Sequence, residues 1–172
     1  MPEIDLPQVP LAQLRETYSQ SCYTIDGLWF SLVEQKYGTD SALAIDVEVW
    51  RLLGRIQAKR MIEKFAIRES NPLLTLIKAL LMDPITPIYK PVVPFLDENR
   101  AVFRITDCPP QKARLKDGRG LFPCREVGLA YYGTYAEVVD PRIKLTCQAC
   151  PPEKYDADRW CEWQFEIKEG ED

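Results

Sequence analysis

Five of the chain's six cysteines lie beyond residue 100, and the chain contains no histidine. The five are Cys108, Cys124, Cys147, Cys150 and Cys161. Histidine is the commonest metal ligand and a frequent acid–base group, so its absence removes both roles together. A soft metal held by this chain must therefore be held mainly by thiolates, completed by a carboxylate or an exogenous group. The sequence predicts a zinc ion or an iron–sulfur cluster at these five cysteines.

The cysteines stand near the ends of predicted elements. Cys108 ends a strand, Cys124 lies in the first turn of a helix, Cys150 follows the next strand and Cys161 opens the last one. If those last two strands pair antiparallel, the end of one lies beside the start of the other. Cys150 and Cys161 would then be neighbours, and Cys147 would lie one or two residue pairs further into the sheet. This placement predicts a tetrahedral thiolate site at one edge of a sheet.

Other interpretations of the same cysteines remain open. Only one Cys-x-x-Cys step is present, at Cys147–Cys150, and free cysteines often pack as small hydrophobic residues. A disulfide is the least favoured alternative. Cys124 is also a candidate catalytic nucleophile, because a helix N-terminus and the adjacent Arg125 both favour its thiolate. In that case Asp107 or Glu126 would assist it.

A second group of candidates lies in the first half of the chain. Asp26 and Glu34 belong to a predicted helix that is otherwise nearly all apolar, so we expect them to line a pocket. Trp29 and Trp50 are expected to bind a ligand there, and Arg60 is the candidate partner for a buried carboxylate. The alternative is that the carboxylates form structural ion pairs or face water and that the tryptophans are core residues.

Hydrophobic periodicity predicts an α+β fold, with N-terminal helices packed on a C-terminal twisted antiparallel sheet of about four strands with one inserted helix. Residues 1–172 are expected to form one domain, with a helical half (1–83) and a sheet half (84–172). In the long helix, Val49, Trp50, Leu53, Ile56, Met61 and Phe65 are expected to face the core. The predicted helices span residues 10–23, 25–37, 46–66, 72–83 and 123–139, and a helix is expected to begin near Thr39 or Asp40, which are both good N-caps. The predicted strands span residues 85–96, 100–106, 142–147 and 161–167, and residues 109–120 are expected to form a polar loop.

Composition and net charge indicate which kinds of partner the chain can bind. The chain has 172 residues, 46% of them hydrophobic and 28% charged, and a formal net charge of −4. No basic stripe is evident, which argues against a nucleic-acid partner. The acidic, proline-broken start is unlike a signal peptide, and the apolar run 72–82 is too short to span a membrane. We expect a cytoplasmic protein with reduced thiols that takes a small-molecule ligand and forms a homodimer or docks on a larger enzyme.

Several motifs resemble an uncharacterised family of bacterial and archaeal cytosolic proteins. They include Asp26-Gly-Leu-Trp29, Asp107-Cys-Pro-Pro110, Phe122-Pro-Cys124 and Cys147-Gln-Ala-Cys150. More distantly, the order of strands, helix and cysteines resembles the L-2-amino-thiazoline-4-carboxylate hydrolase-like proteins and the four-vinyl-reductase (hydrocarbon-binding) domains. That resemblance implies helices on a twisted antiparallel sheet, a small-molecule pocket between them and, in some members, a metal at the cysteines. Chemistry that requires histidine, including a histidine-bound haem, does not carry over.

These features together predict a small-molecule and metal-binding domain with a thiolate site at the sheet edge. Two other functions remain open. One is a hydrolase of a small cyclic or sulfur-containing substrate, with Cys124 as the reactive group. The other is a non-catalytic accessory subunit of a larger enzyme. Whether the protein is an enzyme is left undecided by the sequence.

Overall fold

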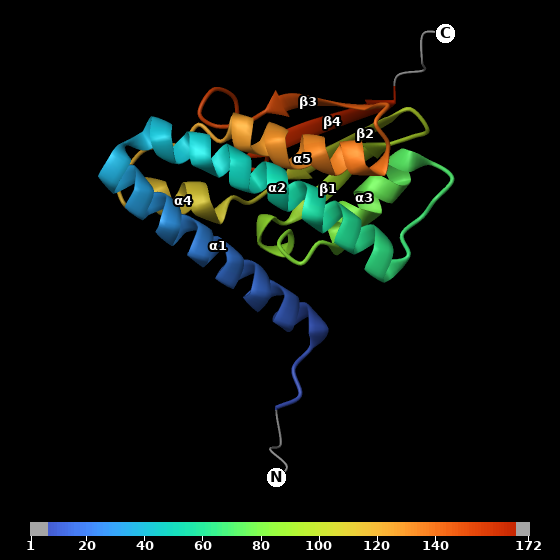
Figure 1. Cartoon of the computed structure of the whole chain (residues 1–172), viewed down its shortest axis with the longest axis horizontal. Helices are drawn as coiled ribbons and strands as arrows, with labels where there is room; N and C mark the ends of the chain where they lie inside the picture. Colours follow the sequence, from blue (N-terminus) through green and yellow to red (C-terminus); the bar gives the residue numbers. More distant parts are fainter. Residues whose placement is uncertain (1–6, 168–172) are drawn as a thin grey trace.

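Three helices form the N-terminal half in a computed structural model that describes residues 7–167. They are α1 (Leu11–Tyr37), α2 (Thr39–Phe65) and α3 (Pro72–Met82). The rest consists of a 3₁₀ turn (Pro87–Tyr89), strands β1 (Pro91–Leu96) and β2 (Arg100–Ile105), helices α4 (Pro109–Lys116) and α5 (Arg125–Val139), and strands β3 (Ile143–Ala149) and β4 (Cys161–Ile167) (Figure 1). The predicted α+β class is confirmed. The start of the N-terminal segment, residues 1–6, lies outside the described residues.

The four strands form one antiparallel sheet in the order β1-β2-β4-β3. The predicted pairing of the last two strands is confirmed, with Cys147 opposite Trp163 and an irregularity between Cys147 and Ala149. On the other side of β4, Ile105 of β2 pairs with Cys161. Proline-rich β1 lies at the sheet edge, as predicted, because a proline cannot donate to a central ladder. Cys161 therefore begins a central strand and lies close to the ends of both neighbours.

Helix α5 lies over the sheet, and α2 lies beside α5 (Figure 1). Two glycines allow the close approach of these layers. A Cβ atom on Gly54 of α2 would lie 2.5 Å from Thr134 Oγ1 and 2.6 Å from the Tyr131 carbonyl oxygen of α5. A Cβ atom on Gly128 of α5 would lie 2.3 Å from a ring carbon of Trp163 in β4. Any larger residue at either position would push the layers apart.

The burial of α2 differs from the predicted pattern. Trp50 and Met61 are buried as expected, but Val49, Ile56 and Phe65 are 40–50% exposed. The buried face instead carries small and polar residues: Ala42, Asp46, Gly54, Gln57 and Ala58. Close packing on α5 requires small residues, and hydrogen bonds satisfy the buried Gln57. Apolar periodicity alone therefore predicted only part of the buried face of α2.

Several predicted boundaries differ from those of the structure. Residues 109–116 form helix α4 and not a loop, because Pro109 and Pro110 occupy the first turn, where no backbone N–H is needed. The predicted helix start near Thr39 is confirmed, and α2 continues from there to Phe65 as one helix that includes the segment predicted separately from residue 46. The helices predicted at 10–23 and 25–37 are one continuous helix, α1. Within residues 7–167, no helix combines the length and the apolar character needed to cross a bilayer.

One buried carboxylate ties the helices together. Asp83, at the C-terminal end of α3, is fully buried and accepts hydrogen bonds from the Tyr131 hydroxyl (2.8 Å) and the Ile85 backbone N–H (3.0 Å). It also accepts from Gln57 Nε2 at 3.1 Å. Burial raises the pKa of Asp83, while these donors favour its ionised form. Asp83 is therefore a satisfied structural group linking α2, α3 and α5.

Candidate metal centre and adjoining cavity

Three of the five candidate cysteines meet at one place. The sulfur atoms of Cys124, Cys150 and Cys161 all lie within 4.8 Å of one another. The Sγ atoms of Cys124 and Cys150 are 3.6 Å apart, and those of Cys150 and Cys161 are 3.9 Å apart. Antiparallel pairing of β3 and β4 brings Cys150 and Cys161 together, and the start of α5 adds Cys124. The predicted convergence is confirmed for these three, and we call them the thiol cluster.

The other two candidate ligands lie outside the thiol cluster. Cys108 is buried, but it follows β2 by three residues and begins α4, so the chain carries it past the sheet edge. Burial raises the pKa of the Cys108 thiol to about 12. Cys147 is half-buried on β3, and its thiol donates to the Ala149 carbonyl oxygen at 3.5 Å. The Cys147 thiol interacts with that of Cys150, but it does not lie within 4.8 Å of all three sulfur atoms of the cluster.

The thiol cluster favours one thiolate, at Cys124. Hydrogen bonds from the Cys150 and Cys161 thiols hold the pKa of Cys124 well below its usual range, although burial opposes this shift. The pKa values of Cys150 and Cys161 are raised, because both would have to ionise beside the Cys124 thiolate. Arg125, which the sequence suggested as the activating cation of Cys124, instead acts on Cys147, whose pKa is lowered first by a hydrogen bond with Cys150 and then by Arg125. The cluster thus holds its first negative charge without a cation.

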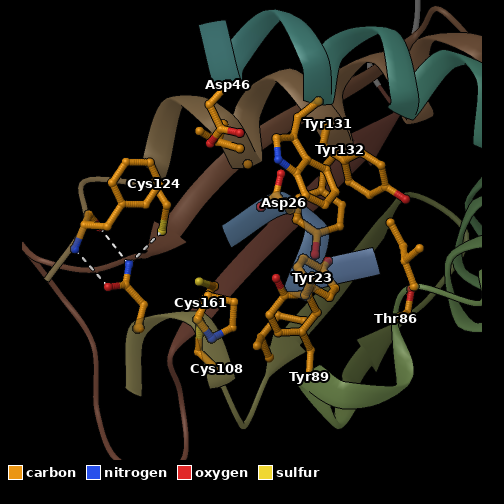
Figure 2. Close-up of a pocket in the computed structure, with 18 of the residues that line it drawn as sticks. Tyr23, Asp26, Asp46, Thr86, Tyr89, Cys108, Cys124, Tyr131, Tyr132 and Cys161 are labelled. Atoms are coloured by element: carbon orange, nitrogen blue, oxygen red, sulfur yellow. Dashed lines mark hydrogen bonds between the residues drawn. The ribbon is translucent and has the colours of Figure 1, made fainter. Parts of the chain in front are cut away.

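Gln111 holds Cys124 in place, and sequence reasoning missed it because α4 was expected to be a loop. Its side-chain amide is buried, donates to the Phe122 carbonyl oxygen at 2.7 Å and accepts from the Phe122 backbone N–H at 2.9 Å. The same Nε2 atom lies 3.3 Å from Cys124 Sγ. The dashed lines in Figure 2 show this arrangement. Gln111 therefore fixes the segment before α5 and donates to the thiolate.

A cavity of about 130 Å³ adjoins the thiol cluster (Figure 2). Cys124 and Cys161 of the cluster line it, together with Cys108. Its walls are largely aromatic and come from α1, α2, α5, the sheet and the 3₁₀ turn: Tyr23, Trp50, Tyr89, Phe122, Tyr131, Tyr132 and Trp163. The cavity is larger than a single water needs, so its volume suits a small molecule.

Two carboxyl groups line the same cavity. Asp26 of α1 is one of the predicted pocket residues, and burial raises its pKa to about 6. Asp46 of α2 is only 3% exposed, and burial together with the charge of Asp26 raises its pKa to about 8. Hydrogen bonding to Trp29 and then to Trp50 lowers the pKa of Asp26, and hydrogen bonding to Trp50 lowers that of Asp46. The sequence offered one signal for Asp46, its place four residues before Trp50 on the same helix face.

Of the other residues predicted to line the pocket, Glu34 forms an ion pair outside the cavity and Trp29 does not line it. Glu34 pairs with Arg114 of α4 through two hydrogen bonds, of 2.9 and 3.1 Å, and these lower its pKa. The expected partner Arg60 instead donates to Gln57. Glu34 therefore belongs to an ion pair in a groove between α1 and α4, outside the thiol-lined cavity. Trp29 does not line that cavity, whereas Trp50 does.

The two acids expected to assist Cys124, Asp107 and Glu126, both form ion pairs with basic side chains. Asp107 forms ion pairs with Lys90 (3.0 Å) and Lys112, which lower its pKa. Glu126 pairs with Arg125 on the exposed side of α5. Neither lines the cavity, so Asp26 and Asp46 are the carboxylic acids that share it with Cys124.

The chain belongs to a family of unknown function (DUF6125), which matches residues 6–167. The predicted membership of an uncharacterised family is thereby confirmed in its general form. No curated protein matches the chain. The match shows no similarity to the thiazoline-carboxylate hydrolase-like proteins or to the four-vinyl-reductase domains.

Proposed function

We propose that the protein binds one soft metal ion, with zinc the best fit, through the thiolates of Cys124, Cys150 and Cys161. The observation that carries this proposal is the spacing of the sulfur atoms. Tetrahedral zinc with Zn–S bonds of about 2.3 Å places its sulfur ligands about 3.8 Å apart. The two Sγ separations of 3.6 and 3.9 Å lie on either side of that value.

The same spacing favours a single ion over an iron–sulfur cluster. Cubane clusters take four cysteines, each on a different iron, so their thiolates stand farther apart than those that share one ion. Within the described residues, three sulfur atoms meet at this spacing and a fourth does not. Three protein ligands leave one position of a tetrahedral ion for water or a ligand. Two of the three cysteines line the cavity, so we propose that this open position faces it.

Metal titration of the whole chain tests the proposal. Metal-free protein is titrated with Co²⁺, whose thiolate charge-transfer absorption reports sulfur ligation, and the Co²⁺ is then displaced with Zn²⁺. We expect one ion per chain, and we expect Cys161→Ser to lose the absorption. Cys22→Ser, on α1 and outside the thiol cluster, is the matched control. Absence of stoichiometric binding, or equal loss in both variants, would contradict the proposal.

A reactive-cysteine hydrolase is the second candidate. The low pKa of the Cys124 thiol supports it, since the thiolate is the nucleophilic form. In that case Asp46 would supply or accept the proton in the cavity. Iodoacetamide should then alkylate Cys124 of the metal-free protein much faster than the other cysteines. Uniform, slow alkylation of all six thiols would rule this candidate out.

A further inference from the structure

Asp46 lacks the partners that the fold supplies to its other buried aspartate. Its Oδ1 atom is buried without a hydrogen-bond partner, although Asp46 is only 3% exposed. Asp83, equally deep, receives hydrogen bonds from Tyr131, Gln57 and the backbone. A buried carboxyl oxygen without a donor is unfavourable, because it has lost its hydration and gained no hydrogen bond in exchange. The difference indicates that the missing donor at Asp46 comes from a bound molecule.

The surroundings of Asp46 specify the charge of that molecule. Asp26 lies near Asp46 in the cavity (Figure 2), and Trp50 interacts with both carboxyl groups. Among the described residues that line the cavity, none is lysine or arginine. The lining thus offers carboxylic acids, thiols and aromatic faces, and aromatic faces attract cations. The adjoining groove, which Asp26 and Asp46 also line, contains Lys90, Arg114 and Arg119, but these pair with Asp107, Glu34 and Asp117. The cavity therefore offers an anionic ligand no free counter-charge.

We propose that the cavity binds a small molecule with a protonated amine, whose N–H groups donate to Asp46 and Asp26. The aromatic rings of Tyr23, Trp50 and Tyr131 would surround its carbon chain. The inference rests on the proposed function in one respect, that this cavity is a binding site, and it does not require the metal. It assigns a ligand class to the cavity and a role to Asp46 beyond packing.

Calorimetric titration of the full-length chain with n-butylammonium chloride tests this inference. 1-Butanol and sodium butyrate, of similar size, are the uncharged and anionic comparisons. In metal-free protein near neutral pH, we expect the amine to bind at least about tenfold more tightly than either. Asp46→Asn should weaken amine binding about tenfold or more, because the ammonium group binds the ionised carboxylate and displaces the proton that Asp46 otherwise holds, which asparagine cannot reproduce. Glu48→Gln, which removes a carboxylate from the exposed side of the same helix, should not change it.

The zinc content of the same samples separates this inference from the proposed function. Zinc binding without amine preference would overturn the inference and leave the metal site standing. Amine preference without zinc binding would support the inference and contradict the proposed metal site. Equal affinity for amine and alcohol, preference for butyrate, or unchanged binding in Asp46→Asn would each overturn the inference. Circular dichroism of Asp46→Asn confirms that any loss of binding occurs in folded protein.

Helix α1 carries a row of exposed apolar side chains on its outer face. Apolar side chains there recur at alternating steps of three and four residues, the heptad spacing of a coiled-coil seam. They are 48–72% exposed, and we call them the α1 stripe: Leu11, Leu14, Tyr18, Ile25, Leu28 and Leu32. Ser21 fills the one remaining position of the pattern between Leu11 and Leu32. The N-terminal part of α1 extends away from the sheet and the other helices (Figure 1).

Helix α2 carries a second stripe of the same kind. Ile45, Val49, Leu52 and Ile56 follow steps of four, three and four residues and are 40–62% exposed. Ten such side chains expose on the order of 800 Å² of apolar surface, about what one partner contributes to a stable interface. A monomer rarely exposes so large an apolar surface. Neither stripe contains a charged residue, so neither calls for a partner of opposite charge.

We infer that a second copy of this chain covers both stripes. Each copy offers two consecutive helices with heptad seams, and two copies related by a twofold axis can pair four such helices in a closed bundle. This places the dimer interface on helices α1 and α2. A partner protein of another kind would leave the purified chain monomeric.

Sedimentation equilibrium of the purified full chain at micromolar concentration tests the dimer. We expect a dimer for the unmodified chain and a monomer for the double variant Ile25→Glu, Leu32→Glu. Leu115→Glu, which charges a half-exposed leucine on α4, should remain dimeric. Circular dichroism confirms that the double variant is folded. A monomeric unmodified chain, or a double variant that still dimerises, would overturn the inference.

Discussion

Gly128 of α5 lies directly against the indole ring of Trp163 in β4. A Cβ atom at Gly128 would lie 2.3 and 2.4 Å from two carbon atoms of that ring, far inside van der Waals contact. Trp163 is buried in the core and also lines the cavity beside the thiol cluster. The packing of this helix on this strand therefore sets both the stability of the sheet and the shape of the cavity.

Gly128→Ala should destabilise the protein by about 1–3 kcal/mol, because the indole or the helix must shift to admit one methyl group. Urea unfolding measures the change. Gly133→Ala is the matched control on the same helix, where a Cβ atom would meet Leu145 at an ordinary 3.8 Å. That substitution should be neutral or stabilise by up to about 1 kcal/mol through helix propensity. Equal effects of the two substitutions would show that the contact with Trp163 does not limit packing.

Asp46 should make stability fall as pH rises. Its pKa is about 8 in the folded chain, against 3.8 for a free aspartate. Between about pH 4 and pH 8 the folded state therefore holds a proton that the unfolded state has lost, so unfolding becomes easier with each added unit of pH. Asp46→Asn removes this loss and should be more stable than the unmodified chain at pH 8, by on the order of 3–5 kcal/mol.

Denaturant unfolding at several pH values measures this effect. Asp26, with a pKa of about 6, should leave a smaller decline between about pH 4 and pH 6 in the Asp46→Asn variant. Parallel stability curves for the variant and the unmodified chain would mean that Asp46 is ionised in the fold.

Sequence reasoning located the elements of this fold better than it located the site. The strands at 142–147 and 161–167 alternate clearly, so their pairing and the meeting of Cys150 with Cys161 were predictable. Cys124 was predictable as a residue at a helix start. Cys108 was misplaced because a proline pair that looks like a loop in fact opens α4.

The acids of the cavity show a different limit of sequence reasoning. Asp26 stood out because its helix is otherwise apolar, while Asp46 marks the start of a predicted helix with many charges and was not singled out. Its burial depends on how closely α2 packs on α5 at Gly54, a tertiary contact that periodicity does not encode. The partner of Glu34 was likewise unpredictable, because Arg114 lies 80 residues away in the sequence.

The ion pair between Glu34 and Arg114 should contribute measurably to stability. Both side chains are largely buried, at 16% and 13% exposure, and two hydrogen bonds join them. Glu34→Gln should cost about 1–3 kcal/mol, since it leaves the guanidinium without its counter-charge. Glu48→Gln, which breaks an exposed pair with Arg51, should cost less than about 0.5 kcal/mol. Thermal unfolding of both variants checks the difference, and equal costs would make the α1–α4 pair a surface contact in energetic terms.

Zinc affinity should rise steeply with pH. Cys124 favours the thiolate form, whereas the pKa values of Cys150 and Cys161 are raised, so binding must displace about two protons. The zinc affinity should then increase about 100-fold per pH unit near neutrality, a slope of about two. Competition with a chromophoric chelator at several pH values measures that slope. At a free zinc concentration of about 1,000 times the dissociation constant, zinc should stabilise the fold by about 4 kcal/mol, and this gain should vanish with chelator or in Cys161→Ser. A pH-independent affinity would mean that Cys150 and Cys161 do not bind the ion as thiolates.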